Sequence, residues 1–227
     1  MSITLCAFDA YGTLFDVAAA ARRAAEETEF GHLKDHPGLA ETWRGKQLGY
    51  TWLRAAYGCH TDFWTVTTQA LDYALEAHGL DDDDRLRDRL LQLYWELEAF
   101  PEVRGTLEAL REAGTRCAIL SNGEPEMLEA AVESAGLADL LDAVISAEAA
   151  GVFKPDRAVY DLVGQQFATA RREVLFVSSN GWDAAFATAY GFRTLWVNRK
   201  GEPVDRLPFR PERIAGTLDG LADLVAA

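Results

Sequence analysis

The sequence has few cysteines and no long apolar run. Its three cysteines, Cys6, Cys59 and Cys117, show no pairing pattern, which argues against a disulfide-stapled secreted scaffold. No stretch of about 18 or more apolar residues runs without a charge, so we expect no membrane-spanning helix. The start of the chain, Met1 to Ala10, lacks a basic region followed by a cleavable apolar segment. We therefore expect a cytoplasmic protein with reduced thiols.

Positive charge is scarce relative to negative charge. Lys and Arg number 22 against 36 Asp and Glu, which gives a formal net charge of −14. Nucleic acids and anionic membranes are bound through clustered Lys and Arg, and here these residues are scattered among the acids. We expect neither partner. A small anionic substrate stays compatible with this charge, because salt screens the net field beyond about 10 Å and a few local cations can dominate inside a pocket.

What the chain does have is an alternation of short apolar runs with segments of helical periodicity. Glycines at Gly114, Gly136 and Gly191 stand where these helices should end. Continuous apolar strands alternating with helices indicate an α/β fold with a doubly wound, Rossmann-like parallel sheet. The expected strands are 3–8, 117–120, 143–145, 174–177 and 194–197, and the expected helices are 103–113, 125–135, 155–167 and 182–190.

The stretch from residue 16 to residue 100 breaks this alternation. It contains helical patterns such as 86–97 but no convincing buried strand. We expect a helical cap domain at 16–100, inserted into an α/β core domain formed by 1–15 and 101–227. The acidic run 81–84 lacks the alternating spacing and glycine of a calcium loop, so it is interpreted as a solvated helix start.

Polar side chains follow three of the expected strands. Asp9 to Thr13 follow the first strand, Ser121 and Asn122 follow the second, and Ser178 to Asn180 follow the fourth. A single Ser, Asn or Asp in such a place usually caps a turn, but open parallel sheets bind ligands beyond these strand ends. Asp9 comes directly after apolar residues, so its carboxylate must be held by donors or do chemistry. Lys154, just before Pro155, is a candidate partner for it.

Four ordered motifs together resemble those of the haloacid dehalogenase superfamily. The match is specific as a set, because the order and the placement at strand ends both agree, and it spans nearly the whole chain. The motifs are Phe8-Asp9-Ala10-Tyr11-Gly12-Thr13-Leu14, Leu120-Ser121-Asn122-Gly123, Lys154-Pro155 and Ser178-Ser179-Asn180-Gly181-Trp182-Asp183.

Two positions decide between branches of that superfamily. Most members are magnesium-dependent phosphatases, with a second Asp two residues after the nucleophile and acidic residues in the fourth motif. Here the first position is Tyr11, and Asp183 is the only carboxylate of the fourth motif. Magnesium prefers carboxylate oxygens. These substitutions resemble the type II L-2-haloacid dehalogenase branch, which implies a hydrolase acting on carbon–halide bonds with no metal and no cofactor. A magnesium-dependent phosphatase of the same superfamily is the alternative.

The segment 42–54 of the expected cap also resembles that branch, in which one arginine faces the nucleophile. Arg44 takes this position. Periodicity alone supports equally well an amphipathic helix with Leu48 and Trp52 on the core face and Arg44 in solvent. Gly45 and Gly49 are weak helix residues, so the sequence leaves the geometry of this segment open.

The resemblance implies hydrolysis of an L-2-haloalkanoic acid to a D-2-hydroxy acid through an ester on Asp9. The carboxylate of Asp9 would attack C2 of the substrate and displace the halide. Lys154 would keep Asp9 ionised, and Thr13 and Ser178 would orient it.

The other implied roles surround this nucleophile. Ser121 and the main-chain amide of Asn122 would hold the substrate carboxylate. Arg44, assisted by Asn180, would face the departing halide. Asp183, with Asn180, would position or deprotonate the hydrolytic water. Tyr160 would brace this polar network. The alkyl group of the substrate would be enclosed by four apolar or aromatic side chains, Tyr11, Leu48, Phe63 and Trp182.

Two further interpretations stay open beside the phosphatase. One is a non-catalytic binding protein, although a scaffold has no physical reason to place Asp9, Lys154 and Asp183 at strand ends. The other is a hydrolase for a different activated carbon centre. The resemblance also implies a homodimer, and the aromatic-rich segment 43–64 would offer apolar surface to bury.

Overall fold

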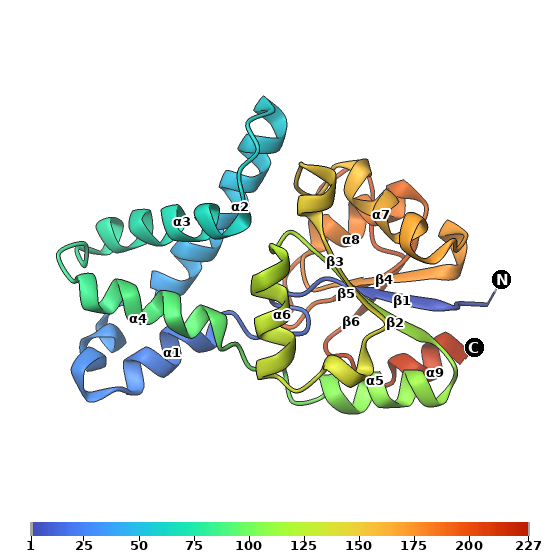
Figure 1. The fold of residues 1–227 in the computed structure, drawn as a ribbon, viewed down its shortest axis with the longest axis horizontal. Helices are drawn as coiled ribbons and strands as arrows, with labels where there is room; N and C mark the ends of the chain where they lie inside the picture. The colour runs from blue at the N-terminus through green and yellow to red at the C-terminus, as the bar shows by residue number, and fades with distance from the viewer. Residues whose placement is uncertain (1, 227) are drawn as a thin grey trace.

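The computed structural model describes residues 2–226. Figure 1 shows a parallel sheet with flanking helices, which carries both termini, and a separate group of helices beside it. The sheet has six strands in the order β3-β2-β1-β4-β5-β6. The strands are β1 (Leu5–Phe8), β2 (Arg116–Ser121), β3 (Ala143–Ser146), β4 (Val174–Ser178), β5 (Arg193–Val197) and β6 (Arg213–Ala215).

The central strands are buried on both faces. Every residue of β1 and of β4 is buried, as expected of parallel strands covered by helices. Alternate residues of β1 face different cores: Cys6 and Phe8 pack with α5 (Val103–Glu112), and Leu5 and Ala7 pack with α7 (Arg157–Phe167). The helices α6 (Pro125–Ser134), α8 (Gly181–Tyr190) and α9 (Leu221–Ala226) complete the two layers. The doubly wound α/β fold predicted from the sequence is confirmed.

Four α-helices form the group beside the sheet. They are α1 (Ala19–Glu26), α2 (Leu39–Tyr57), α3 (Phe63–His78) and α4 (Asp84–Trp95), with a 3-10 segment over Thr28–Asp35. The carboxylate of Asp62 caps α3 by accepting from Thr65 N at 2.6 Å, and that of Asp83 caps α4 by accepting from Leu86 N at 2.9 Å. The acidic run before α4 is thus a helix start, and α2 continues through Gly45 and Gly49 without a break. None of the helices among the described residues is long and apolar enough to cross a membrane.

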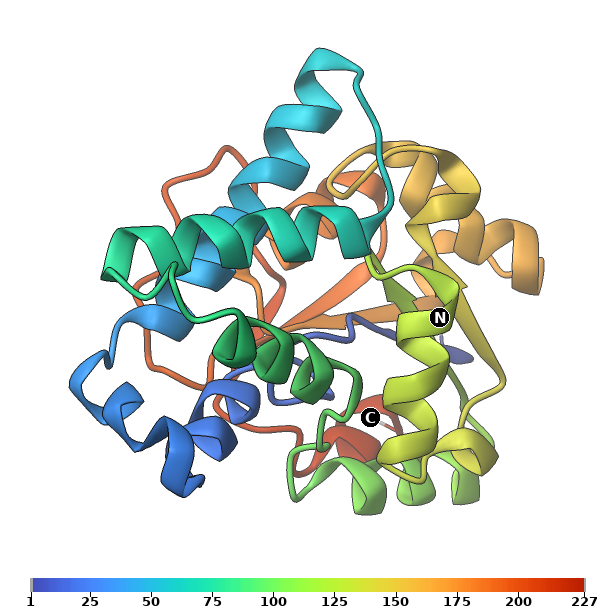
Figure 2. The same ribbon diagram turned by 60° about the vertical axis from the view of Figure 1, so that its left-hand side comes forward.

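The two connections between sheet and helices run side by side. Asp16 N donates to Glu98 O and Phe100 N donates to Leu14 O, each at 2.9 Å. These two hydrogen bonds pair the connecting segments and hold the helical group beside the carboxyl end of β1. Figure 2 shows α1 to α4 lying in front of the sheet at that end.

Candidate active site

The carboxyl ends of β1, β2 and β4 meet at the edge of the sheet that faces the helical group. β1 pairs with β2 on one side and with β4 on the other, so residues far apart in the sequence become neighbours there. Open parallel sheets bind ligands at this position. The polar residues singled out at the strand ends are therefore brought into one place.

Asp9 follows β1 directly and is 6% exposed. Lys154 Nζ lies 3.1 Å from its Oδ1, while Thr13 Oγ1 and Asn180 Nδ2 donate to its Oδ2 at 3.1 and 3.0 Å. Its backbone N–H donates to Val177 O at 2.9 Å, which ties it to β4. Three side-chain donors thus fix the direction in which the Asp9 carboxylate points. Such a carboxylate is equipped for nucleophilic attack.

Lys154 bridges two carboxylates in the interior. Its Nζ lies 3.1 Å from Asp9 Oδ1 and 2.9 Å from Asp183 Oδ2, and the side chain is 1% exposed. Burial by itself would lower the pKa of Lys154, but the carboxylates of Asp183 and Asp9 outweigh burial and raise it. The amine is therefore charged at neutral pH. Asn122 Oδ1 accepts from Lys154 N at 2.9 Å, so the end of β2 helps to place this lysine.

Asp183 lies in the first turn of α8 and is fully buried. Tyr160 Oη donates to its Oδ1 at 2.7 Å and Ser178 Oγ donates to its Oδ2 at 3.1 Å. Burial raises the pKa of Asp183, and the charge of Lys154 opposes that rise. Burial and the neighbouring Asp183 raise the pKa of Tyr160 well above its usual value, so its hydroxyl keeps its proton and donates.

The prediction that Ser178 orients Asp9 is wrong about its partner. Ser178 donates to Asp183, and its oxygen accepts from Asn180 N at 3.1 Å. The reason is local: α8 begins soon after β4 ends, so its first turn folds Asp183 back over the strand end. Asn180 contacts Asp9 with its side chain, which places it beside the nucleophile.

Ser121 and Asn122 stand at the end of β2, next to β1. Ser121 is 1% exposed, and its Oγ accepts from Gly123 N at 3.2 Å. A Cβ on Gly123 would lie 2.7 Å from the Tyr11 ring, so glycine is needed for Tyr11 to pack against this strand end.

Arg44 reaches from α2 toward the loop that follows β1. Its Nη2 donates to Tyr11 O at 3.2 Å and its Nη1 donates to Gln47 Oε1 at 2.7 Å. The segment is a helix, but the interpretation that put Leu48 and Trp52 on its core face is wrong: the buried residues of α2 are Leu39, Trp43, Gln47 and Thr51, and Trp52 is exposed. The guanidinium of Arg44 points toward the loop after β1 rather than into open solvent.

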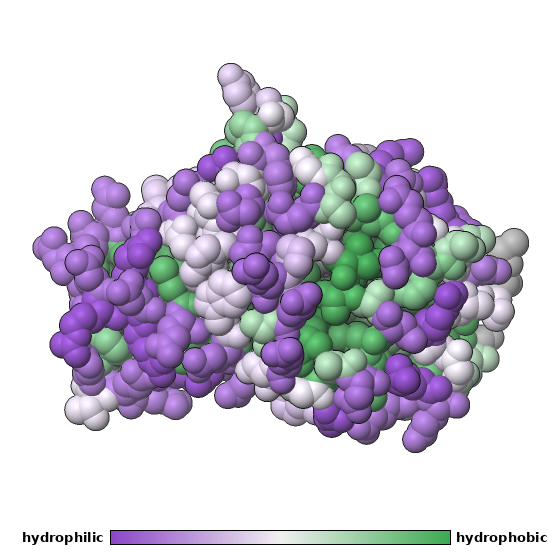
Figure 3. All heavy atoms as spheres, in the orientation of Figure 1, coloured by the Kyte–Doolittle hydropathy of each residue, from purple (hydrophilic) through white to green (hydrophobic). Residues whose placement is uncertain are grey.

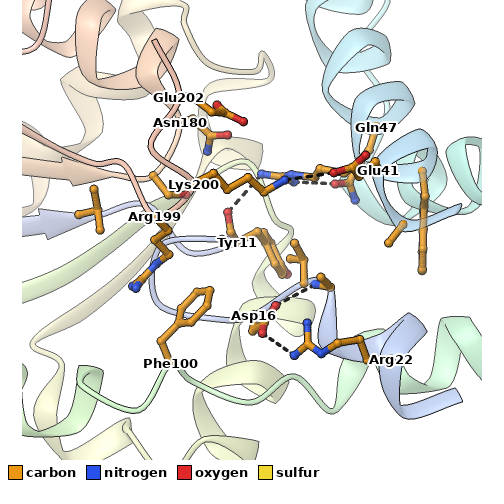
Figure 4. A pocket seen from close by; sticks show the side chains of 18 of the residues that line it. Tyr11, Asp16, Arg22, Glu41, Gln47, Phe100, Asn180, Arg199, Lys200 and Glu202 are labelled. Carbon is orange, nitrogen blue, oxygen red and sulfur yellow. Dashed lines mark hydrogen bonds and ion pairs between the residues drawn. The ribbon is translucent and has the colours of Figure 1, made fainter. Parts of the chain in front are cut away.

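A cavity of about 620 Å³ opens beside Arg44, between α2 and the loops after β1, β4 and β5. Asp9 is not among the residues that line it, but Asn180 is, and Asn180 donates to Asp9. Figure 4 shows Lys200 extending across this opening toward Glu41 of α2, 3.5 Å away.

Aromatic side chains cover the site on the helical side. Tyr11 stacks on Phe63 with ring centroids 5.7 Å apart, and Trp182 meets Trp52 of α2 edge to face at 5.3 Å. The hydroxyl of Tyr11 and Nε1 of Trp182 are buried without a protein partner among the described residues. Leu48 is half-buried on α2, one turn after Arg44.

The positive charge between the two carboxylates of the site comes from the protein itself. Within residues 2–226 no group of three or more His, Cys, Asp or Glu side chains is placed to hold one. The charge between Asp9 and Asp183 is supplied by the ammonium of Lys154. The arrangement can provide a fixed carboxylate nucleophile, a second carboxylate with a raised pKa, and an arginine on the opposite wall.

Sequence reasoning missed Gln47, Thr67 and Tyr94, which lie behind Arg44. Gln47 Nε2 donates to Thr67 Oγ1 at 2.7 Å and to Tyr94 Oη at 3.0 Å. Gln47 stands three residues after Arg44, on the same face of one helix, and this spacing was a usable signal. Tyr94 comes from α4, and no spacing rule links it to α2.

Comparisons with known proteins identify the family. A family model described as haloacid dehalogenase-like hydrolase matches residues 3–191. The (S)-2-haloacid dehalogenase 1 of Pseudomonas sp. (strain CBS-3) is 44% identical, over 93% of this chain and 91% of its own length. A solved L-2-haloacid dehalogenase is 41% identical with a TM-score of 0.93, covering 100% of both chains.

A second solved structure is the L-2-haloacid dehalogenase of Xanthobacter autotrophicus with chloropropionic acid covalently bound. It is 37% identical with a TM-score of 0.86 and covers 99% of both chains. The resemblance seen in the four motifs is confirmed, and this chain belongs to the haloacid dehalogenase-like hydrolase family.

Proposed function

We propose that this chain hydrolyses L-2-haloalkanoic acids to D-2-hydroxy acids through an ester on Asp9, without a metal ion. The observation that carries the proposal is the Asp9 carboxylate, buried and held by Lys154, Thr13 and Asn180. The relatives and solved structures reported above are 2-haloacid dehalogenases, which supports the same substrate class here.

In the first step a carboxylate oxygen of Asp9 forms a bond to C2 as the carbon–halogen bond breaks, and the electron pair leaves with the halide. Arg44 faces the halide, assisted by Asn180, because a leaving anion gains most from a preorganised cation in a dry site. Ser121 and the main-chain amide of Asn122 bind the substrate carboxylate. The alkyl group rests against Tyr11, Leu48, Phe63 and Trp182.

In the second step water attacks the side-chain carbonyl of the Asp9 ester and releases the hydroxy acid. Asp183, with Asn180, positions or deprotonates this water. Its raised pKa supports the role, because a carboxylate with a higher pKa is a stronger base. Tyr160 and Ser178 hold Asp183 in place, and Lys154 stabilises the regenerated Asp9 carboxylate.

The phosphatase alternative is weakened by one residue. A phosphatase of this fold carries an Asp two residues after the nucleophile, where it acts as general acid and base. Here that position is Tyr11. Burial raises the pKa of its hydroxyl, which lies against Gly123. The ring packs as part of the wall and stacks on Phe63.

We also propose two domains, a core domain of 1–15 and 101–227 and a cap domain of 16–100.

We propose further that the protein is cytoplasmic and forms a homodimer. The three cysteines are free, which is compatible with a reducing compartment. The end of α2 stands clear of the rest of the surface (Figure 3) and exposes Leu53 and Tyr57. A second copy would cover these side chains. Light scattering that gave a clean monomer at micromolar concentration would reject the dimer.

The test of the mechanism follows the oxygen of water. With enzyme in excess over L-2-chloropropionate in heavy-oxygen water, the first turnover should label the peptide containing Asp9 and give unlabelled lactate, because the product hydroxyl comes from the enzyme's carboxylate. Asp9→Asn should abolish that turnover. Label in the first-turnover lactate, with Asp9 unlabelled, would show that water attacks C2 directly and would reject the ester.

A further inference from the structure

Gln47 is a buried amide whose every polar atom is used. It is 1% exposed. Its Oε1 accepts from Arg44 Nη1 at 2.7 Å, and its Nε2 donates to Thr67 Oγ1 at 2.7 Å and to Tyr94 Oη at 3.0 Å. A buried amide costs free energy unless it is hydrogen-bonded, so this side chain is held in one place.

The orientation of the amide is fixed by the hydroxyl of Thr67. That hydroxyl donates its single proton to Phe63 O at 2.7 Å, so toward Gln47 it can only accept. The NH₂ group of Gln47 must therefore face Thr67, and its carbonyl oxygen must face Arg44. Phe63, Thr67, Gln47 and Arg44 form one directed chain of hydrogen bonds.

The charge of Arg44 is left uncompensated. Of the cations that line the cavity, Arg22 pairs with Asp16 at 2.6 Å, Arg199 with Glu102 at 2.6 Å and Lys200 with Glu41 at 3.5 Å. Over residues 2–226, Arg44 alone among them has no carboxylate partner and binds only the neutral Gln47 and the carbonyl of Tyr11. A guanidinium has five N–H donors, so donors remain for an anion.

We propose that Gln47 is a positioning residue that aims the guanidinium of Arg44 at the departing halide while leaving its positive charge free. The inference rests on the proposed function, in which Arg44 meets the halide. A glutamate at this position could accept the same hydrogen bond, but its charge would offset that of Arg44 in a poorly solvated site. Neutrality at position 47 is thus part of the leaving-group site.

The test replaces Gln47 by Glu and, separately, by Met. Gln47→Glu should lower kcat for L-2-chloropropionate by about tenfold or more and weaken inhibition by chloride to a similar degree, because the halide then meets a neutralised pair. The ratio of wild-type kcat to Gln47→Glu kcat, measured at each pH, should fall toward one as the pH falls, because the introduced carboxyl is then protonated. Gln47→Met adds no charge but frees the guanidinium, so kcat should fall with a smaller change in chloride inhibition.

The matched control is Gln69→Glu. Gln69 Oε1 also accepts from an arginine, Arg54 Nη2 at 2.9 Å, but that pair is exposed and neither residue lines the cavity. Its kcat and chloride inhibition should match wild type. If both Gln47 variants stay within about twofold of Gln69→Glu, the inference is wrong; Gln47→Met decides alone if Gln47→Glu does not fold. A wild-type enzyme with no dehalogenase activity would instead reject the proposed function itself.

Discussion

The two walls of the site hold their charges in opposite ways. On the sheet side, Asp9, Lys154 and Asp183 form a buried group in which each charge has a charged neighbour. On the α2 side, Arg44 is a single cation held by two neutral oxygens. A nucleophile must stay ionised inside the protein, and a paired charge achieves that. A leaving anion is stabilised best by a cation whose charge is not already neutralised by a carboxylate.

Removing the central cation of the sheet side should have the largest effect. Lys154→Met leaves two buried carboxylates without their partner, so we expect turnover to be abolished. The free energy of unfolding, measured with urea, should fall by about 3–5 kcal/mol.

The control for this change is Lys200→Met. Lys200 is 69% exposed and pairs with Glu41 across the cavity, and exposed pairs contribute about 0–1 kcal/mol. Equal urea midpoints for the two variants would show that the buried group on the sheet side is not the stabilising unit described here.

The α2 side should respond in turnover rather than in stability. Arg44→Lys keeps the charge but loses the planar fork that binds Gln47 and Tyr11 O together. We expect turnover of L-2-chloropropionate to fall by about a hundredfold, with little change in the urea midpoint.

Arg111→Lys provides the comparison, because Arg111 is exposed on α5 and lies 4.0 Å from Asp142. If Arg44→Lys and Arg111→Lys both keep turnover within about twofold of wild type, Arg44 does not act on the halide.

Alkaline pH should remove the charge of the central cation on the sheet side. The carboxylates of Asp183 and Asp9 raise the folded pKa of Lys154 above its ordinary value, so its contribution to stability is fully present below about pH 10.4 and is lost as the pH rises through the folded pKa.

Urea unfolding of wild type and Lys154→Met over this alkaline range measures the effect. Wild type should lose stability more steeply than the variant, because only wild type carries the titrating amine. Parallel curves would mean that the two carboxylates do not raise the pKa of Lys154.

Sequence patterns located the sheet wall better than the α2 wall. The central strands are continuous apolar runs whose ends are marked by polar residues, so β1, β2 and β4 were found to within about two residues. The short β6, which is largely exposed, and the terminal α9 were missed. Neither has a buried stripe long enough to show a period.

Side-chain partners were harder to predict than positions. The pairing of Ser178 with Asp183 instead of Asp9 depends on how tightly α8 turns back over β4. The link from Gln47 to Tyr94 joins α2 to α4, and only the packing of the two helices determines it. Such contacts between elements leave no periodic mark in a single sequence.

Exhaustive chelation should have the smallest effect, namely none. The cation that faces Asp9 and Asp183 is the ammonium of Lys154, which is covalently part of the chain. Tyr11 also removes the carboxylate that a magnesium phosphatase carries next to its nucleophile. We therefore expect the rate of halide release from L-2-chloropropionate to be unchanged in excess chelator, and phosphate-ester hydrolysis to be negligible with or without added magnesium. Turnover that disappears in chelator and returns with magnesium would overturn the comparison, because Asp9 would then require a second cation that the lysine does not replace.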